Sequence, residues 1–208
     1  MKYGRELLKK VIDSKGYKYF ENGDLNLNII GIRNSKTAGQ VTNRFDDTIT
    51  LSYKQDGEWK YHEFDCTTDP GKFYMEDPIV DEKGTAILKE GQYRGSHKLR
   101  LHQGKYLALG QCRPVTVYRD NNRDDIYNLN TENLDTGLFG INIHRATARA
   151  GKKSIQVDKW SAGCQVIADN DDWHEFLDIC QHAREVWGNS FTYTLIESKD
   201  TDKLKTYI

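Results

Sequence analysis

Two residues of this chain, His144 and Cys164, are of types that can perform nucleophilic catalysis together. His144 ends the alternating run Phe139-Gly-Ile-Asn-Ile-His144, whose period of two predicts a half-buried strand with the histidine on its polar face. Cys164 follows the small-residue turn Ser161-Ala-Gly163 and precedes the apolar Val166-Ile167. A thiol needs a nearby base to become a thiolate, and histidine commonly serves. We therefore expect a nucleophile–base pair.

This arrangement resembles the catalytic domain of the L,D-transpeptidases, which act on bacterial peptidoglycan. The family signature is a histidine, an intervening loop and then Ser/Thr-x-Gly-Cys, and here it reads His144, a loop and Ser161-Ala-Gly-Cys164. The resemblance implies that Cys164 takes the acyl group and that His144 removes its proton. It also implies that Ser161 and Gly163 shape the turn, orient the imidazole and help to form the oxyanion hole.

Two positions depart from the family pattern. Family members often have glycine after the histidine and arginine two residues after the cysteine, where this chain has Arg145 and Val166. The arginine bears on how a substrate carboxylate is held. Arg145 and Arg149 are candidates to replace it, because a guanidinium matches a carboxylate bidentately. For each, an exposed loop arginine is the alternative.

A further resemblance concerns the substrate groove, where family members carry a Pro-x-Gly-x-aromatic segment. Both Asp69-Pro-Gly-Lys-Phe73 and Glu90-Gly-Gln-Tyr93 resemble it, and the sequence does not choose between them. Tyr93 is therefore a candidate substrate-binding residue. Of the other histidines, His97 or His102 could reach the cleft, and the rest are expected to face solvent.

The resemblance implies acyl transfer in two halves. The Cys164 thiolate attacks the carbonyl carbon of a stem-peptide bond, and backbone N–H groups around Gly163 and Cys164 stabilise the oxyanion. His144 then protonates the leaving amine, and a thioester remains. An amine resolves the thioester in a transpeptidase, whereas water resolves it in a carboxypeptidase or endopeptidase. The sequence leaves both open.

Two other classes of function remain open. A virion or wall-binding protein could keep the fold without the activity, and the departures at Arg145 and Val166 are compatible with that. A cysteine protease acting on proteins is the third class, and no further motif supports it.

The composition excludes some kinds of partner. The chain has 208 residues and a formal net charge of −1, so no overall basic field favours nucleic acid. No apolar run approaches the roughly 20 residues that span a membrane, and the first residues lack the apolar region of a secretory signal. We expect a protein made in the bacterial cytoplasm, which a phage particle or lysis could deliver to the wall. A signal removed from the sequence would explain the same observation.

The sequence predicts neither a metal site nor a cofactor. Cys66, Cys112 and Cys180 show no zinc-ligand spacing, and we expect free thiols, with Cys180 buried on a helix. The segment 120–131 alternates acidic and amide residues as calcium loops do, but its sixth and twelfth positions do not fit that loop.

Hydrophobic patterning predicts a mainly β, mainly antiparallel domain, either a β-sandwich or an open barrel of the L,D-transpeptidase type. An N-terminal helical segment (1–24) precedes the catalytic domain (25–198), and a charged tail (199–208) follows it. Asp56-Gly57 lies between alternating runs and predicts a hairpin. One helix is expected after the nucleophile, beginning near 169–172, where acidic and amide residues can cap it.

Overall fold

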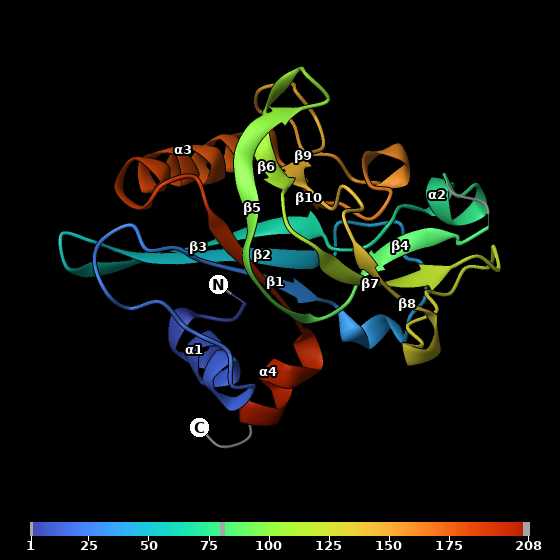
Figure 1. Cartoon of the computed structure of the whole chain (residues 1–208), viewed down its shortest axis with the longest axis horizontal. Helices are drawn as coiled ribbons and strands as arrows, with labels where there is room; N and C mark the ends of the chain where they lie inside the picture. The colour runs from blue at the N-terminus through green and yellow to red at the C-terminus, as the bar shows by residue number, and fades with distance from the viewer. Residues whose placement is uncertain (1, 80–81, 206–208) are drawn as a thin grey trace.

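The structure is a computed structural model that describes residues 2–79 and 82–205, and within that part of the chain its main feature is a closed barrel of eight strands (Figure 1). The order around the barrel is β1, β11, β5, β6, β9, β10, β3 and β2. The bounds are β1 (Asn28–Arg33), β2 (Asp47–Gln55), β3 (Glu58–Thr67), β5 (Gly91–His102), β6 (Tyr106–Gln111), β9 (Ile143–Arg145), β10 (Gln165–Ile167) and β11 (Phe191–Glu197). The prediction of a mainly β fold is confirmed.

The barrel is closed, whereas a sandwich or open barrel was predicted. Closure follows from β1, which pairs antiparallel with β2 on one side and parallel with β11 on the other. The second parallel pair is β9 with β10, and the remaining pairs of the barrel are antiparallel. Closure leaves the barrel without exposed strand edges that could pair with another chain.

A second, three-stranded sheet lies beside the barrel and was not predicted as a separate sheet. It contains β4 (Thr85–Leu88), β7 (Val115–Asp120) and β8 (Leu134–Gly137), in the order β4, β7, β8. Buried residues of β4 and β7 belong to the same hydrophobic cluster as the barrel interior. The small sheet therefore shares the core of the predicted domain 25–198.

The hairpin predicted at Asp56-Gly57 is confirmed. β2 and β3 pair antiparallel along their length, with Gln55 opposite Glu58. Asp56 and Gly57 have φ angles of 54° and 80°, the left-handed conformation that two-residue hairpin turns require.

Two predicted helices are present. α1 (Arg5–Ser14) buries its apolar stripe against the outside of β1 and β11. α3 (Asn170–Trp187) follows the nucleophile, and Asp169 caps it by accepting a hydrogen bond from the Asp171 N–H. Cys180 lies buried on α3, as expected. Further short helices are α2 (Lys72–Glu76) and the 3-10 turns Ser35–Thr37, Thr131–Asn133 and Asp158–Trp160.

Much of the predicted charged tail is a helix. α4 (Ser198–Lys205) packs beside α1 below the barrel (Figure 1). Thr201 is buried, and Asp200 forms an ion pair of 2.9 Å with Lys15 just after α1. The sequence did not predict this helix because its composition is rich in charge. Only one narrow face, which includes Leu204, contacts the core. Residues 206–208 of the predicted tail lie outside the described residues.

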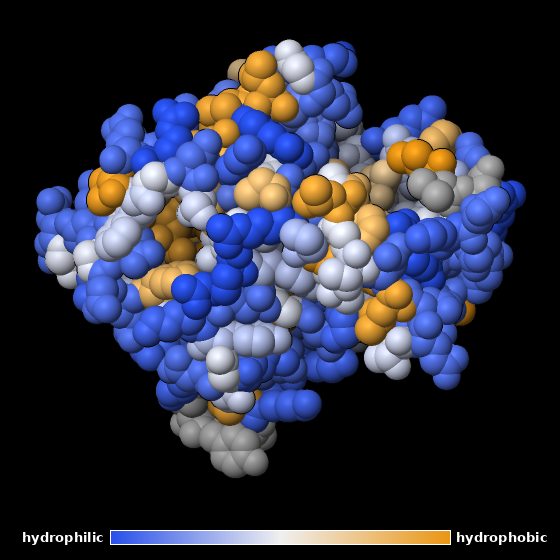
Figure 2. Space-filling model, viewed as in Figure 1, coloured by the Kyte–Doolittle hydropathy of each residue, from blue (hydrophilic) through white to orange (hydrophobic). Residues whose placement is uncertain are grey.

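The surface is mainly hydrophilic, and apolar side chains gather on the visible face in separate small groups (Figure 2). Within residues 2–79 and 82–205, no helix combines the length and the apolarity that crossing a membrane requires.

One glycine of β1 makes room for a buried tyrosine. A Cβ at Gly31 would overlap the hydroxyl of Tyr193, which projects from the neighbouring β11. The Tyr193 hydroxyl donates a 2.7 Å hydrogen bond to Gln165 Oε1 inside the barrel. Gly31 thus lets a polar side chain cross the barrel and reach the residue after Cys164.

Gly31→Ala should lower the free energy of unfolding by about 1–3 kcal/mol, because the added methyl group overpacks a rigid interior. Urea denaturation of both proteins measures it. Gly91→Ala is the matched control, because a Cβ there meets the Tyr93 ring at an ordinary 3.5 Å. Equal stability of the Gly31 variant and the wild type would contradict the close-packing argument.

Candidate functional site

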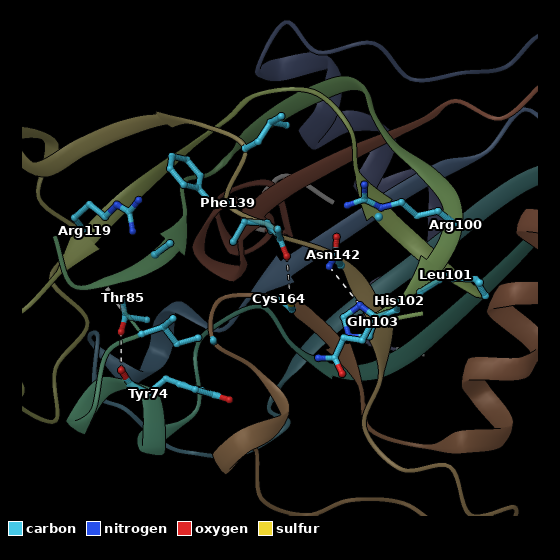
Figure 3. Close-up of a pocket in the computed structure, with 18 of the residues that line it drawn as sticks. Tyr74, Thr85, Arg100, Leu101, His102, Gln103, Arg119, Phe139, Asn142 and Cys164 are labelled. Carbon is cyan, nitrogen blue, oxygen red and sulfur yellow. Dashed lines mark hydrogen bonds between the residues drawn. The ribbon is translucent and has the colours of Figure 1, made fainter. Parts of the chain in front are cut away.

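His144 and Cys164 lie on neighbouring chain segments, and Cys164, but not His144, is among the described residues that line a cavity. β9 and β10 pair in parallel with Val166 opposite His144, and Gln165 N–H donates to Asn142 O at 2.8 Å. Since side chains alternate along strands, Cys164 projects from the same face as Asn142 and His144. The cavity, about 580 Å³, lies between the barrel and the small sheet, and Cys164 is part of its wall (Figure 3).

The turn before Cys164 is held by the buried hydroxyl of Ser161. Its Oγ donates to the carbonyl oxygen of Cys164 at 2.8 Å and accepts from the N–H of Gly163 at 3.1 Å. Ser161 therefore shapes the turn, but it does not orient the imidazole as the resemblance implied. The Gly163 N–H is also occupied, so it is not free to stabilise an oxyanion.

Gly163 is required at its position for two reasons. Its φ angle is 120°, a conformation that side-chain-bearing residues rarely adopt. A Cβ there would also overlap the carbonyl oxygen of Ala86 on β4 and approach Ile141 at 3.1 Å. The nucleophile turn is thus pressed against the small sheet, which forms the opposite wall of the cavity.

The sulfur of Cys164 is held as a thiol. Its Sγ–H donates to the carbonyl oxygen of Gly140 at 3.3 Å (Figure 3). Burial raises the pKa of Cys164 to about 11, although the backbone N–H of Asn142, directed at the sulfur, opposes this by favouring the thiolate. At neutral pH the unliganded site therefore contains a protonated nucleophile.

His144 is buried, with 5% of its surface exposed, and not on an open polar face as predicted. Other side chains cover it, which the alternation of the strand could not reveal. Its Nδ1–H donates to the carbonyl oxygen of Arg145 at 2.8 Å, so Nε2 is the nitrogen left to accept a proton. Burial lowers the pKa of His144 to about 4, and the neighbouring His102 adds to this effect. The imidazole is neutral at pH 7.

The two residues of the expected pair share one face of the paired segments, and no hydrogen bond joins them within the described residues. Within the described residues Sγ of Cys164 bonds to Gly140 O and not to His144. The site is thus a thiol beside a neutral imidazole, and not a preformed thiolate–imidazolium ion pair.

His102 is the functional candidate that sequence reasoning left undecided. It lines the cavity, and its ring stacks on His144 with centroids 4.4 Å apart. Its Nδ1 accepts a hydrogen bond from the side-chain amide of Asn142 at 3.3 Å. His97, the other alternative, lies buried in the barrel and bonds to Ile141 O at 2.9 Å. Only the pairing of β5 with β6, and of β6 with β9, distinguishes the two.

The structure places none of the three predicted substrate-binding residues in the cavity wall. Arg145 stacks on the Tyr106 ring, with Cζ 4.3 Å from its centroid. Arg149 is exposed in the loop between β9 and β10. Tyr93 turns its hydroxyl into the fold and donates to Lys89 O at 2.6 Å. The other groove-like segment, 69–73, leads into α2, whose Tyr74 does line the cavity.

Arginines that the sequence did not single out line the cavity instead. Arg100 comes from β5 and Arg119 from β7. No aspartate or glutamate is among the residues of 2–79 and 82–205 that line it. The exposed apolar side chains of Ile79, Leu101 and Leu138 also contribute to its wall. Cation and apolar surface together suit an organic anion.

No group of three or more histidine, cysteine, aspartate or glutamate residues within the described parts of the chain could hold a metal ion. In the calcium-like segment, Asp120 instead accepts the N–H of Asn128 at 2.7 Å. The four cysteines are free thiols.

Ser161→Ala should destabilise the protein by about 1–3 kcal/mol, because it leaves the buried Gly163 N–H and Cys164 carbonyl without their partner. Thermal or urea unfolding tests this. Ser154→Ala, in the loop before the turn, provides a comparison that leaves the turn intact. If the two variants lose the same stability, the Ser161 hydroxyl does not hold the turn.

The alkylation rate of Cys164 by iodoacetamide should rise about tenfold per pH unit from pH 7 to pH 10. The reactive thiolate forms as the pH rises toward the pKa of about 11, and at pH 7 only roughly one thiol in ten thousand is ionised. His144, with a pKa of about 4, stays neutral over this range and adds no step. Peptide mass spectrometry resolves each cysteine, and fully buried Cys66 and Cys180 are internal controls. A plateau reached below pH 9 would show that Cys164 ionises more easily than its burial implies.

Comparison with protein-family models, with curated proteins and with solved structures gives no match. The site consists of a cysteine on a hydrogen-bonded turn, a histidine on the neighbouring strand, and a cavity with arginines in its wall that Cys164 also lines.

Proposed function

We propose that the protein is a cysteine-dependent acyl transferase acting on peptidoglycan stem peptides, with a domain of the L,D-transpeptidase type. The observation that carries the proposal is the parallel pairing of β9 with β10, which sets His144 and Cys164 on one face. Cys164 lines the cavity, and so does His102, which stacks on His144. The hydrogen bond from His144 Nδ1 to Arg145 O supports it further, because it leaves Nε2 unprotonated. The Ser-x-Gly-Cys turn also supports the proposal, because it resembles the signature of the L,D-transpeptidases.

The first half of the reaction begins from the thiol. As Sγ of Cys164 forms a bond to the peptide carbonyl carbon, its proton passes to Nε2 of His144 and the carbonyl π electrons move onto oxygen. When the carbonyl reforms, the C–N bond breaks and His144 returns the proton to the leaving amine. A neutral imidazole at the start is what this transfer requires.

The backbone N–H of Cys164 supports stabilisation of the oxyanion. No described residue accepts a hydrogen bond from it, whereas Ser161 already accepts the N–H of Gly163. A donor aimed at developing negative charge typically contributes on the order of 3–4 kcal/mol to the transition state. We assign this role to Cys164 N–H in place of Gly163 N–H.

The thioester then meets either an amine or water. An amine attacks the acyl carbon and gives a cross-linked peptide, whereas water gives a shortened stem peptide with a new carboxylate. In both cases His144 Nε2 takes a proton from the attacking group and returns one to Sγ.

A non-catalytic wall-binding or virion protein is the second candidate. The bond between Cys164 Sγ and Gly140 O favours it, because this bond occupies the thiol with a structural partner. Such a protein would bind stem peptides in the same cavity and leave them unchanged.

Incubation of the protein with isolated peptidoglycan should yield new cross-linked or shortened stem peptides, detected by mass spectrometry of muropeptides. Cys164→Ala should abolish these products, and His144→Ala should lower their rate by at least about a hundredfold, the usual contribution of a general base. His182→Ala, exposed on α3, is the matched histidine control and should retain activity.

Unchanged muropeptides from sacculi of several wall chemistries would reject the enzyme. If the same protein then binds the sacculi, the second candidate is supported. Product formation by Cys164→Ala would instead show that the activity does not use this thiol.

A further inference from the structure

We propose that Arg100 determines the specificity of the Cys164 site by binding a carboxylate group of the peptide substrate. This inference depends on the proposed function, because it concerns the same cavity. It assigns the carboxylate to a residue of β5, in place of Arg145 and Arg149.

Arg100 is positioned by the strand beside it. It lies on β5 opposite Ala108 of β6, and its side chain runs across β6 at Gly110. A Cβ at Gly110 would overlap Nε of Arg100 and approach its Cγ and Cδ at 2.7 Å. Because glycine presents no side chain there, the arginine can lie against the strand with its guanidinium at the cavity (Figure 3).

Arg100 is exposed, and its guanidinium has no counterion in the part of the chain that the structure describes. No residue within 2–79 or 82–205 gives it a hydrogen bond acceptor or an ion-pair partner, and no acidic residue of these ranges lines the cavity. Its positive charge disfavours the protonated form of His102, whose pKa is lowered by burial and then by Arg100. An uncompensated cation in a concave site selects an anionic ligand.

Arg119 does not compete for this role. Its Nε and Nη2 donate to Asp135 at 3.3 and 3.2 Å, and its Nη1 donates to Gly84 O at 3.2 Å. Its Cζ also lies 4.6 Å from the Phe139 ring centroid. The guanidinium of Arg119 is therefore already engaged by Asp135, which also pairs with Lys83 at 3.3 Å. Figure 3 shows the two arginines on opposite sides of the cavity, with Cys164 between them.

The chemistry of the site indicates a carboxylate as the anion. Cys164 attacks an acyl carbon, so its ligands are peptides, and the anionic group that unmodified peptides carry is a carboxylate. A planar guanidinium binds it through two parallel N–H bonds. The adjacent Leu101 is exposed and provides an apolar surface for the rest of the peptide. The carboxylate is either the C-terminal group or a side-chain group.

Calorimetric binding to Cys164→Ala protein tests this without turnover. The probes are one stem peptide in three forms: free, amidated at its C-terminus, and amidated at its side-chain carboxyl. Arg100→Gln should weaken binding of the free peptide at least tenfold. One of the two amidated peptides should bind equally weakly to the proteins with Arg100 and with Arg100→Gln. The carboxyl group that is amidated in that peptide is the one that Arg100 binds.

Two further variants show whether the effect comes from the guanidinium of Arg100 or from a general change in charge. Lys98→Gln removes an exposed cation of the same strand that does not line the cavity, and it should bind like the parent protein. Arg100→Lys keeps the charge but loses the paired N–H donors, so its affinity should lie between those of arginine and glutamine. Circular dichroism melting curves verify that each variant folds.

Arg100→Gln protein that binds the free peptide as tightly as the parent overturns the inference. So does an Arg100 effect that is the same for all three peptide forms, because carboxylate recognition predicts a selective effect. Selective carboxylate binding without any muropeptide turnover by the wild type keeps the inference and rejects the proposed enzyme. Turnover that persists unchanged in Arg100→Gln keeps the proposed enzyme and rejects the inference.

Discussion

The position of the Ser161–Cys164 turn depends on the buried side chain of Gln165, the residue after Cys164. Its Nε2 donates to the carbonyl oxygens of Thr68 and Gly163, each at 3.3 Å, and its Oε1 accepts the Tyr193 hydroxyl. One amide thus joins the end of β3, the nucleophile turn and β11. Displacing the turn would leave these buried polar groups without hydrogen-bond partners, which lowers the free energy of unfolding. The arrangement therefore tolerates little displacement.

The same burial that fixes the site also sets its charge state. Cys164 is protonated and His144 is neutral, since a low-polarity interior disfavours both the thiolate and the imidazolium. The cavity wall is different, because Arg100 brings to it a positive charge that no described residue pairs. Under the function proposed above, an anionic peptide would bind first and the sulfur would ionise only as the new bond forms.

Local patterns predicted the local features well. The Asp56-Gly57 hairpin and the two amphipathic helices are present, because each depends on residues close in the sequence. The strand predicted over 139–144 forms only at Ile143–Arg145. Substrate-binding residues were predicted poorly. Tyr93 resembled a groove residue, but its hydroxyl turns inward to backbone carbonyls, and Arg145 instead stacks on a neighbouring ring. Direction and partners of a long side chain depend on strands that lie far away in the sequence.

By itself, the sequence determined a mainly β chain with a histidine strand, a Ser-x-Gly-Cys turn and the residue types for acyl transfer. Tertiary structure alone decided that the barrel closes, that a second sheet forms the opposite wall of the cavity, and that Arg100 and His102 reach it. Both residues belong to β5, separated from Cys164 by about a third of the chain. Only the register of β5 with β6, and of β6 with β9, places them there, and register is set by packing across the whole barrel.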